Sequence, residues 1–313
     1  MSLRKKIRTE AAGVFSLPWI VARELGLFRE EGVEVEFLPS AGAGRNQVAN
    51  PHPVFIEDHR LVSAVGNHTG IQEGKSDSYR ACEWGQVRRT SDHTGGERII
   101  SKRAAVVSQA IFSAPGSRFT HPQTLRNQKV ATRFHHGSHY LAIQSLEGFL
   151  KRDEIKVVHG SHIDGYEAVR RGEIAAVTLM EPWITLAEKE GFQRVVEAHY
   201  QGSEIASPEV DPDSWTRANR AVARAVKIFN EDKRKWVHHL IEGLPPQYAK
   251  LITPDDFYLP RLRYVAPAPY DVEEFQGTYD WLVSWNLIGE NCGYHDLVDN
   301  RISAPDEVAE LVH

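Results

Sequence analysis

The chain has 313 residues, with 37 lysines and arginines against 42 aspartates and glutamates, which gives a net charge of −5. Its 41% hydrophobic and 25% charged residues are enough to bury proper cores, so disorder over the whole chain is excluded. A length above about 250 residues favours two domains. No dense basic run occurs, which argues against nucleic acid as a partner.

Cys82 and Cys292 are the only cysteines, so neither a disulfide framework nor a cysteine pair for zinc is indicated. No apolar run reaches the length of about eighteen residues that spans a bilayer, and we expect no membrane insertion. The start, residues 1–6, leads directly into the first strand without a signal peptide. We therefore expect a cytoplasmic protein, or a periplasmic one whose export segment has been removed.

The first forty residues predict a strand, a helix and a second strand. Residues 7–10 form a short strand, residues 15–28 a loop and a helix that ends at Gly26, and residues 32–38 alternate between apolar and polar. This β-α-β unit is typical of an α/β protein.

A second pattern occurs twice along the chain. In each copy a glycine turn leads through a short strand to a glutamate nine positions later and to a tryptophan close by: Gly74, Glu83 and Trp84 in the first copy, and Gly172, Glu181 and Trp183 in the second. Two similar lobes that each offer a carboxylate and an indole at a strand end predict a ligand cleft between them. The alternative is a chance match of a few positions.

The opening resembles the type II periplasmic-binding-protein fold, in the family that includes sulfonate-, nitrate-, taurine- and thiamine-precursor-binding proteins. The family's phrase of a helix, Gly-Leu-Phe, acidic residues, glycine and a strand stands here at residues 24–35. The resemblance covers most of residues 5–205 and implies an α/β, two-lobed fold with a ligand cleft between the lobes. Its other supports are the entry into a second lobe at 121–131, with Asn127-Gln128 in place of the usual glycine, the Gly-Ser turn within 136–140 and the Pro-Trp pair at 182–183.

The resemblance also implies an organisation and a function. Residues 1–106 would begin lobe 1, residues 107–198 would form lobe 2, and residues 199–313 would complete lobe 1 with helices. We expect the chain to cross between lobes near residues 104–106 and 197–200. The implied function is that of an ABC-transporter-like solute-binding protein, which closes on an anionic or planar nitrogenous small molecule and has a permease as a further partner.

Helices are predicted beyond residue 205. Residues 214–229 place apolar side chains on one helical face, and residues 233–241 form a second helix that ends before Gly243. Asp271 and Glu274 form a capping box for a third helix. We expect these helices to close lobe 1 and to carry no chemistry.

Five residues around the repeated pattern are candidate ligand contacts. Glu83 and Glu181 can accept hydrogen bonds from an amine or ring nitrogen, and Trp84 and Trp183 can stack on a flat or cationic group. Arg80 belongs to the same region of the chain. The alternative is structural: the tryptophans fill the lobe cores, and the glutamates pair with neighbouring arginines such as Arg80.

The turn Gly137-Ser138-His139 is a candidate anion site, with His136 directly before it. It follows a strand and precedes an apolar-periodic helix, so its amides lie at a helix N-terminus, where donors and positive dipole charge gather. Such a turn can hold a sulfonate, a carboxylate or a phosphate. Ser138 is equally suited to be an ordinary helix cap, and the two roles are compatible.

Histidine is abundant, with fifteen copies, and His135, His136 and His139 are clustered. His135 lies at a strand end rather than inside the helix, so we expect no metal site, and no motif indicates a cofactor. An imidazole of this cluster is better suited to hold an anion or to transfer a proton, with His68 and His93 as candidate partners.

The alternative function is an enzyme of the same fold. The fold includes aryl-sulfinate desulfinases, whose cysteine position here is Gly13, and thiamine-pyrimidine synthases, whose cysteine-rich segment is missing here. A lyase or decarboxylase that acts on an aromatic carboxylate stays open, with Glu83, His135 and His136 as its catalytic groups.

Overall fold

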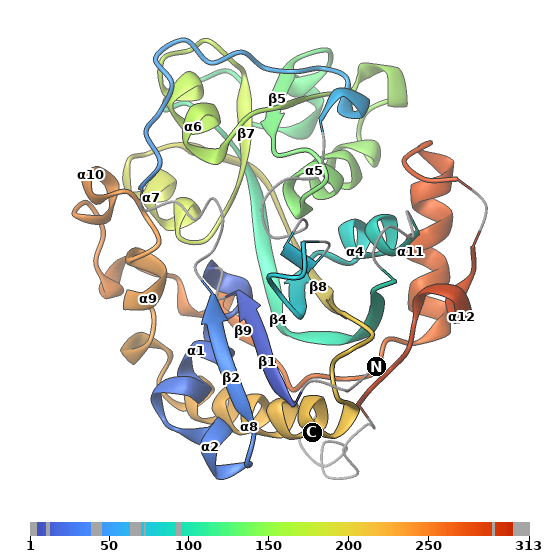
Figure 1. Ribbon diagram of the computed structural model, residues 1–313. Coiled ribbons are helices and arrows are strands. Elements are labelled where there is room, and N and C mark those ends of the chain that lie inside the picture. Colours follow the sequence, from blue (N-terminus) through green and yellow to red (C-terminus); the bar gives the residue numbers. More distant parts are fainter. Residues whose placement is uncertain are drawn as a thin grey trace.

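The computed structural model describes residues 5–10, 13–38, 46–62, 70–71, 73–91, 96–289 and 292–302. Within these residues a single nine-stranded sheet runs through the molecule (Figure 1). Its order is β2-β1-β3-β8-β4-β7-β5-β6, with β9 paired to β4. The strands are β1 (Lys6–Glu10), β2 (Glu34–Leu38), β3 (Ser78–Ala81), β4 (Arg98–Ser113), β5 (Lys129–Thr132), β6 (Lys156–His159), β7 (Ala176–Met180), β8 (Gln193–Ala206) and β9 (Arg263–Tyr264).

The two halves of the sheet repeat one plan. In lobe 1, β1 pairs in parallel with β2 and β3, and β3 pairs antiparallel with β8. In lobe 2, β5 pairs in parallel with β6 and β7, and β7 pairs antiparallel with β4. Gly74 and Gly172, which precede β3 and β7, both have positive φ, as a tight turn before a strand requires. The repeated pattern in the sequence therefore reflects paired lobes.

The long strands β4 and β8 join the lobes. They pair antiparallel from Arg98 opposite Ala206 to Ser113 opposite Gln193, with a shift of register between Lys102 and Val106. At this irregularity β9 pairs with Ala105 and Val106. The two segments where we expect the chain to cross, residues 104–106 and 197–200, thus lie close to each other at the middle of the sheet. The residue boundaries of the lobes stay a prediction.

Lobe 1 is covered by the first helices and by the C-terminal part of the chain. The amphipathic α8 buries Trp215, Ala218 and Val222 and packs against α1, where the rings of Trp19 and Trp215 lie 5.6 Å apart. In Figure 1 α8 runs across the base of lobe 1, and α11 stands beside α4. The helices are η1 (Gly13–Phe15), α1 (Leu17–Glu24), α2 (Leu27–Glu30), α4 (Glu83–Ser91), α8 (Pro212–Glu231), α9 (His238–Ile241), α10 (Pro246–Ala249), α11 (Val272–Ser284) and α12 (Tyr294–Leu297).

Lobe 2 carries α5 (Gly137–Glu147), α6 (His162–Arg170) and α7 (Trp183–Lys189). Helix α5 packs against β4, β5, β7 and β8, whereas α6 packs against β5 and β7. A Cβ on Gly165 of α6 would come within 2.7 Å of the Val177 side chain, so α6 lies on the sheet face to which Val177 points. Because side chains alternate along a strand, Thr178 points to the opposite face.

One C-terminal prediction is confirmed in part and another is wrong. Asp271 accepts from the amide of Glu274 and caps α11, as the sequence predicted, but the Glu274 carboxylate pairs with Lys102 at 2.7 Å instead of completing the capping box. The helix expected over residues 233–241 is instead a 3-10 turn, Lys233–Lys235, followed by the short α9. The cause is local: the Lys235 carbonyl accepts from the His238 ring, and the amide of His239 bonds to the carbonyl of Trp236 in the 3-10 manner. In the part of the chain that the structure describes, no helix combines the length and apolarity needed to cross a bilayer.

Candidate functional site

Arg103 is a buried cation at the junction of the lobes. It lies in the irregular stretch of β4, and its side chain is 0% exposed. Nε donates to the carbonyl of Ala105 at 2.9 Å and Nη1 to the carbonyl of Ala81 at 2.8 Å. The guanidinium also lies 4.2 Å above the ring of Phe15 and 5.0 Å from the ring of Tyr200. Its Nη2 has no hydrogen-bond partner among the described residues. The charge is therefore held by carbonyls and rings rather than by a carboxylate.

Gln109 and Tyr200 gather further polar atoms beside the N-terminus of α5. Gln109 is 0% exposed and Tyr200 is 6% exposed. Within the described ranges, neither amide atom of Gln109 completes a hydrogen bond, and the Tyr200 hydroxyl lies beside the Arg103 guanidinium. A Cβ on Gly137 would lie 2.2 Å from the Tyr200 hydroxyl and 3.3 Å from Gln109 Nε2. Only glycine lets the first turn of α5 approach these groups so closely.

The buried polar groups of Arg103, Gln109 and Tyr200 form what we call the polar floor. Two threonines extend it across the sheet. Thr178 lies opposite Ile111 in the β4–β7 pair, two positions along from Gln109, so Thr178 and Gln109 point to the same face. Thr132 ends β5 and follows Ala131, which pairs with Val177. The hydroxyls of Thr132 and Thr178 are buried, and neither finds a partner among the residues that the structure covers. Such groups cost about 1–3 kcal/mol each when they stay unsatisfied, so their concentration at one place indicates a binding surface.

The predicted anion turn lies at this floor. Gly137, Ser138 and His139 begin α5; the amide of His139 donates to the His136 carbonyl at 2.9 Å, and the amides of Gly137 and Ser138 have no acceptor within the helix. The Ser138 hydroxyl is engaged inside the chain, because it accepts from the Arg133 amide at 3.0 Å. Burial lowers the pKa of the Arg133 guanidinium, and the nearby Tyr79 opposes this shift. The available donors of the turn are thus backbone amides rather than the serine side chain.

Glu83 and Trp84 line a neighbouring cavity of about 460 Å³ between α4, α5, α11 and β8. Burial is the main cause, and the negative charge of the nearby Glu274 the second, of a pKa of about 8 for Glu83. At neutral pH this carboxyl therefore mainly keeps its proton. The Trp84 ring packs 5.1 Å from the Tyr200 ring, which connects this cavity to the polar floor. The remaining lining residues are Leu141, Gln144, Ser145, Ala198, His199, Tyr200, Gln201, Glu273, Glu274, Gly277 and Thr278.

The second copy of the repeated pattern has a different environment. Glu181 is 3% exposed and accepts from Arg261 at 2.9 Å and from the hydroxyl of Thr185 at 2.8 Å. Trp183 packs 5.0 Å from the ring of Tyr248. The structural alternative describes this pair, and Glu181 does not line the cavity that holds Glu83.

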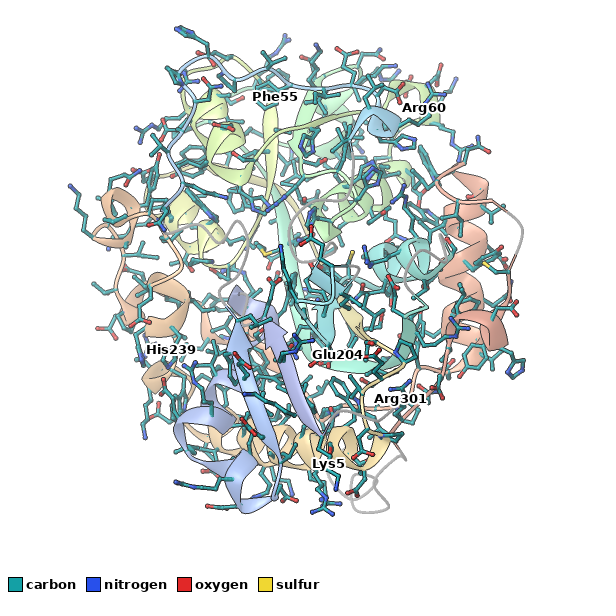
Figure 2. The ribbon with its side chains drawn as sticks, in the orientation of Figure 1. Lys5, Phe55, Arg60, Glu204, His239 and Arg301 are labelled. Atoms are coloured by element: carbon teal, nitrogen blue, oxygen red, sulfur yellow. The ribbon has the colours of Figure 1, made fainter. Side chains whose placement is uncertain are left out.

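Arg80 also lies within a lobe core. Its guanidinium donates to the Glu10 carbonyl at 2.9 Å and to the Thr9 hydroxyl at 3.0 Å, and it lies 4.1 Å from the Trp19 ring. Glu204 of β8, labelled near the centre of Figure 2, is its buried carboxylate partner at 3.4 Å. Arg80 therefore has internal partners on every side and is not part of the polar floor.

His135 and His139 are buried and neutral. Burial lowers the pKa of His135 to about 4 and moves that of His139 well below its usual value. His135 Nε2 lies 2.9 Å from the His59 carbonyl, and the rings of His59, His135 and His139 have centroids 5.8–6.0 Å apart. His136 occupies the N-cap position of α5 without a side-chain cap. The candidate partners His68 and His93 lie outside the described residues.

Arg103, Gln109 and Tyr200 were not among the residues predicted from the sequence. A signal was present, because Arg103 and Gln109 flank and interrupt the apolar run of residues 104–112 in an otherwise buried strand. Buried polar side chains of this kind need partners. Tyr200 carries no comparable signal.

Solved structures resemble this fold along nearly the whole chain. The alkanesulfonate-binding protein SsuA from Xanthomonas axonopodis pv. citri, bound to MOPS, gives a TM-score of 0.69 at 12% identity, over 97% of this chain and 99% of that one. The periplasmic aliphatic sulphonate-binding protein SsuA from Escherichia coli gives 0.68 at 14%, over 95% and 92%. The desulfurization enzyme DszB gives 0.60 at 13%, over 95% and 97%.

No family model matches the chain, and no curated protein matches its sequence. At identities of 12–14% the likeness concerns the fold. The two-lobed type II periplasmic-binding-protein fold that the sequence implied is confirmed.

Proposed function

We propose that this protein is a solute-binding protein whose lobes close on a small organic anion of the sulfonate or carboxylate class. The observation that carries the proposal is the Arg103 guanidinium, which is fully buried, donates to two backbone carbonyls, lies beside the Tyr200 hydroxyl and has no carboxylate in hydrogen-bond contact among the described residues. A buried charge without a counter-charge costs several kcal/mol. An anionic ligand would offset that cost with charge-assisted hydrogen bonds.

The groups around Arg103 are mostly donors. Burial raises the pKa of Tyr200, so its hydroxyl keeps its proton, and Gln109 Nε2 and the first amides of α5 add further donors. The positive end of the α5 dipole favours negative charge at the same place. An acceptor-rich headgroup suits this set. Gln109 Oε1 is unpaired among the described residues and can accept a hydrogen bond from the ligand.

The remainder of the ligand would extend toward Trp84 and Glu83. An indole offers a flat apolar surface, and a protonated carboxyl can donate to a ring nitrogen or a carbonyl. This arrangement supports a ligand with an anionic head and a planar nitrogenous body. The sulfonate-binding neighbours named above add weight to the anionic head.

Closure would occur about the paired strands β4 and β8. Residues 1–106 and 199–313 would move as lobe 1 and residues 107–198 as lobe 2, with the irregular stretch of β4 as the flexible element. A transport role, with an ABC permease as partner, accords with the neighbouring structure of a ligand-binding component of an ABC-type import system from Staphylococcus aureus.

One observation favours an enzyme as the second candidate. The pKa of Glu83, raised to about 8, is suited to general-acid chemistry at neutral pH. His135, His136 and Glu83 would then serve a lyase or decarboxylase. Cys82 does not supply a nucleophile, because burial raises the pKa of its thiol to about 12.

The test is calorimetric titration with a panel of alkanesulfonates, aromatic carboxylates and pyrimidines, followed by mass spectrometry of the bound compound. Arg103→Met should weaken the best anion by at least about thirtyfold, the loss expected when one partner of a buried charge pair is removed. The affinity of Arg103→Lys should lie between those of the wild type and Arg103→Met, because an ammonium keeps the charge but lacks the planar arrangement of donors of a guanidinium. The control is Arg220→Met on α8, whose ion pair with Glu31 is at the surface.

Absence of binding by every anion in the panel, or equal affinity in Arg103→Met, would refute the proposal. If the protein consumes the bound compound and Glu83→Gln does not, the protein is an enzyme and the binding-protein proposal is wrong.

A further inference from the structure

We propose that His238, His239 and Glu242 form a zinc site on lobe 1. One ring nitrogen of each histidine and a carboxylate oxygen of Glu242 lie within 4.8 Å of one another. The group lies on and directly after α9, on the side of the molecule where Figure 2 labels His239. It is separate from the residues that form the polar floor.

The His238 ring has its orientation and tautomer fixed by the backbone. Its Nδ1 lies 2.8 Å from the Lys235 carbonyl, and only the tautomer with a proton on Nδ1 can make this hydrogen bond. Nε2 is then left with its lone pair. The same contact is the reason that the chain forms two short turns here instead of one helix.

The His239 ring lies between two carboxylates. Its Nε2 is buried and lies 3.2 Å from Glu24 Oε1 of α1 without completing a hydrogen bond, whereas its Nδ1 lies 3.6 Å from Glu242 Oε2. The nearer carboxylate favours a proton on Nε2, which leaves the lone pair of Nδ1 facing Glu242. Histidine ligands of zinc commonly give their remote N–H to a carboxylate or a carbonyl; His238 makes such a bond to the Lys235 carbonyl, and Glu24 is placed to receive one from His239.

The spacing suits a tetrahedral cation. Zinc ligands at about 2.0–2.1 Å from the metal lie about 3.3 Å from one another, and His239 Nδ1 and Glu242 Oε2 are already 3.6 Å apart. The side chain of Glu242 is 63% exposed and can move the remaining distance. Two imidazoles and a carboxylate are a ligand set that zinc accepts, with water as the fourth ligand.

All three ligands come from residues 238–242, and Glu24 of α1 lies beside the His239 ring. Helix α9 packs against η1, which carries Phe15 to the Arg103 guanidinium. The metal would therefore order the turn around α9 next to the base of the ligand site. We expect a structural ion that raises the stability of the lobe, because the folded chain holds the His238 ring and the Glu24 carboxylate in place for it.

The test uses the full chain after treatment with a chelator. Calorimetric titration with Zn²⁺ should give one site per chain, and saturation should raise Tm by a few degrees. His239→Ala and His238→Ala should abolish this site. Glu24→Gln should keep the stoichiometry and weaken binding by about 10- to 100-fold, which a merely structural role of Glu24 would not do. The control is His295→Ala, an exposed histidine of α12.

Three measurements keep the outcome decisive. Tm of each variant in chelator reports whether it folds, and if a histidine variant fails to fold, Glu242→Gln takes its place. Co²⁺ in place of Zn²⁺ should give the visible absorption of a tetrahedral site in the wild type and lose it in Glu242→Gln. Failure of the wild type to bind Zn²⁺ in a 1:1 complex, or wild-type affinity in His239→Ala, would overturn the proposal. Affinity for the organic anion is measured separately and tests only the ligand site.

Discussion

Replacement of Gln109 by methionine should stabilise the ligand-free protein and weaken its ligand. Both amide atoms of Gln109 are buried and lack partners among the described residues, so the folded state bears their desolvation without compensation. Methionine has a similar unbranched shape and no strong polar atom. Removing an unsatisfied buried polar group should recover about 1–3 kcal/mol of unfolding free energy.

This gain in unfolding free energy corresponds to a rise in Tm. For a chain of 313 residues, about 2.1 cal/mol/K of unfolding entropy per residue makes 1 kcal/mol worth about 1.5 °C, so Gln109→Met should raise Tm by about 1.5–5 °C. The same variant should lose the hydrogen bond to a charged ligand, about 1.5–3 kcal/mol, and bind about 10- to 150-fold more weakly. Differential scanning calorimetry in ligand-free buffer and titration calorimetry measure the two effects.

Gln86 provides the matched control. It is also a glutamine at 0% exposure, and its Oε1 is unpaired among the described residues, but its Nε2 donates to the carbonyls of Tyr79 at 2.9 Å and of Ser203 at 3.4 Å. Gln86→Met removes one unpaired atom but takes the donor from two buried carbonyls, so it should lower Tm. If Gln109→Met lowers Tm as Gln86→Met does, or binds the anion with wild-type affinity, the reasoning that connects unpaired polar groups to the ligand site is refuted.

Two further predictions concern the helix turn and the histidines. Gly137→Ala should lower the free energy of unfolding by about 1–3 kcal/mol, because the new Cβ would overlap the Tyr200 hydroxyl, and it should weaken anion binding. Thermal unfolding should find a smaller loss in a Tyr200→Phe background. An equal loss in both backgrounds would contradict this cause. The pKa of His135 is about 4 in the folded state and about 6.5 when unfolded, so the unfolded state binds the extra proton between these values and stability falls as pH drops from about 6.5 toward 4. For His135 alone, the free energy of unfolding should be about 2 kcal/mol lower at pH 5 than at pH 8. Denaturant unfolding should therefore find a weaker pH dependence in His135→Gln, and an unchanged dependence would refute this assignment.

The parts of the fold that depend on local pattern could be predicted from the sequence. The β-α-β opening, the glycine turns before β3 and β7 and the cap at Asp271 each rest on residues within a few positions of one another. The strand, turn and helix around Gly137 are confirmed for the same reason, because they form a local signal, while anion binding at this turn stays a prediction.

The rest depends on contacts that no local pattern contains. Glu181 was expected at the ligand, but its partner Arg261 lies 80 positions away and holds it in the core. Arg80 likewise depends on Glu204, 124 positions away. Arg103 and Gln109 stand out in the sequence as polar residues in an apolar strand, but the groups that face them become known only once β4 is seen to cross between the lobes.

The exchange of strands between the lobes has a consequence for how the chain is made. The last strand of each half-sheet is one of the two strands that connect the lobes. Strand β4 runs from lobe 1 into lobe 2 and pairs there with β7, and β8 runs from lobe 2 into lobe 1 and pairs there with β3. During synthesis β3 therefore keeps an open edge until β8, more than a hundred residues later, has left the ribosome. Such late pairing slows folding and leaves an edge that invites aggregation. Neither lobe is a unit that can be cut out and expected to fold, and the protein should reach its native state only after translation of both.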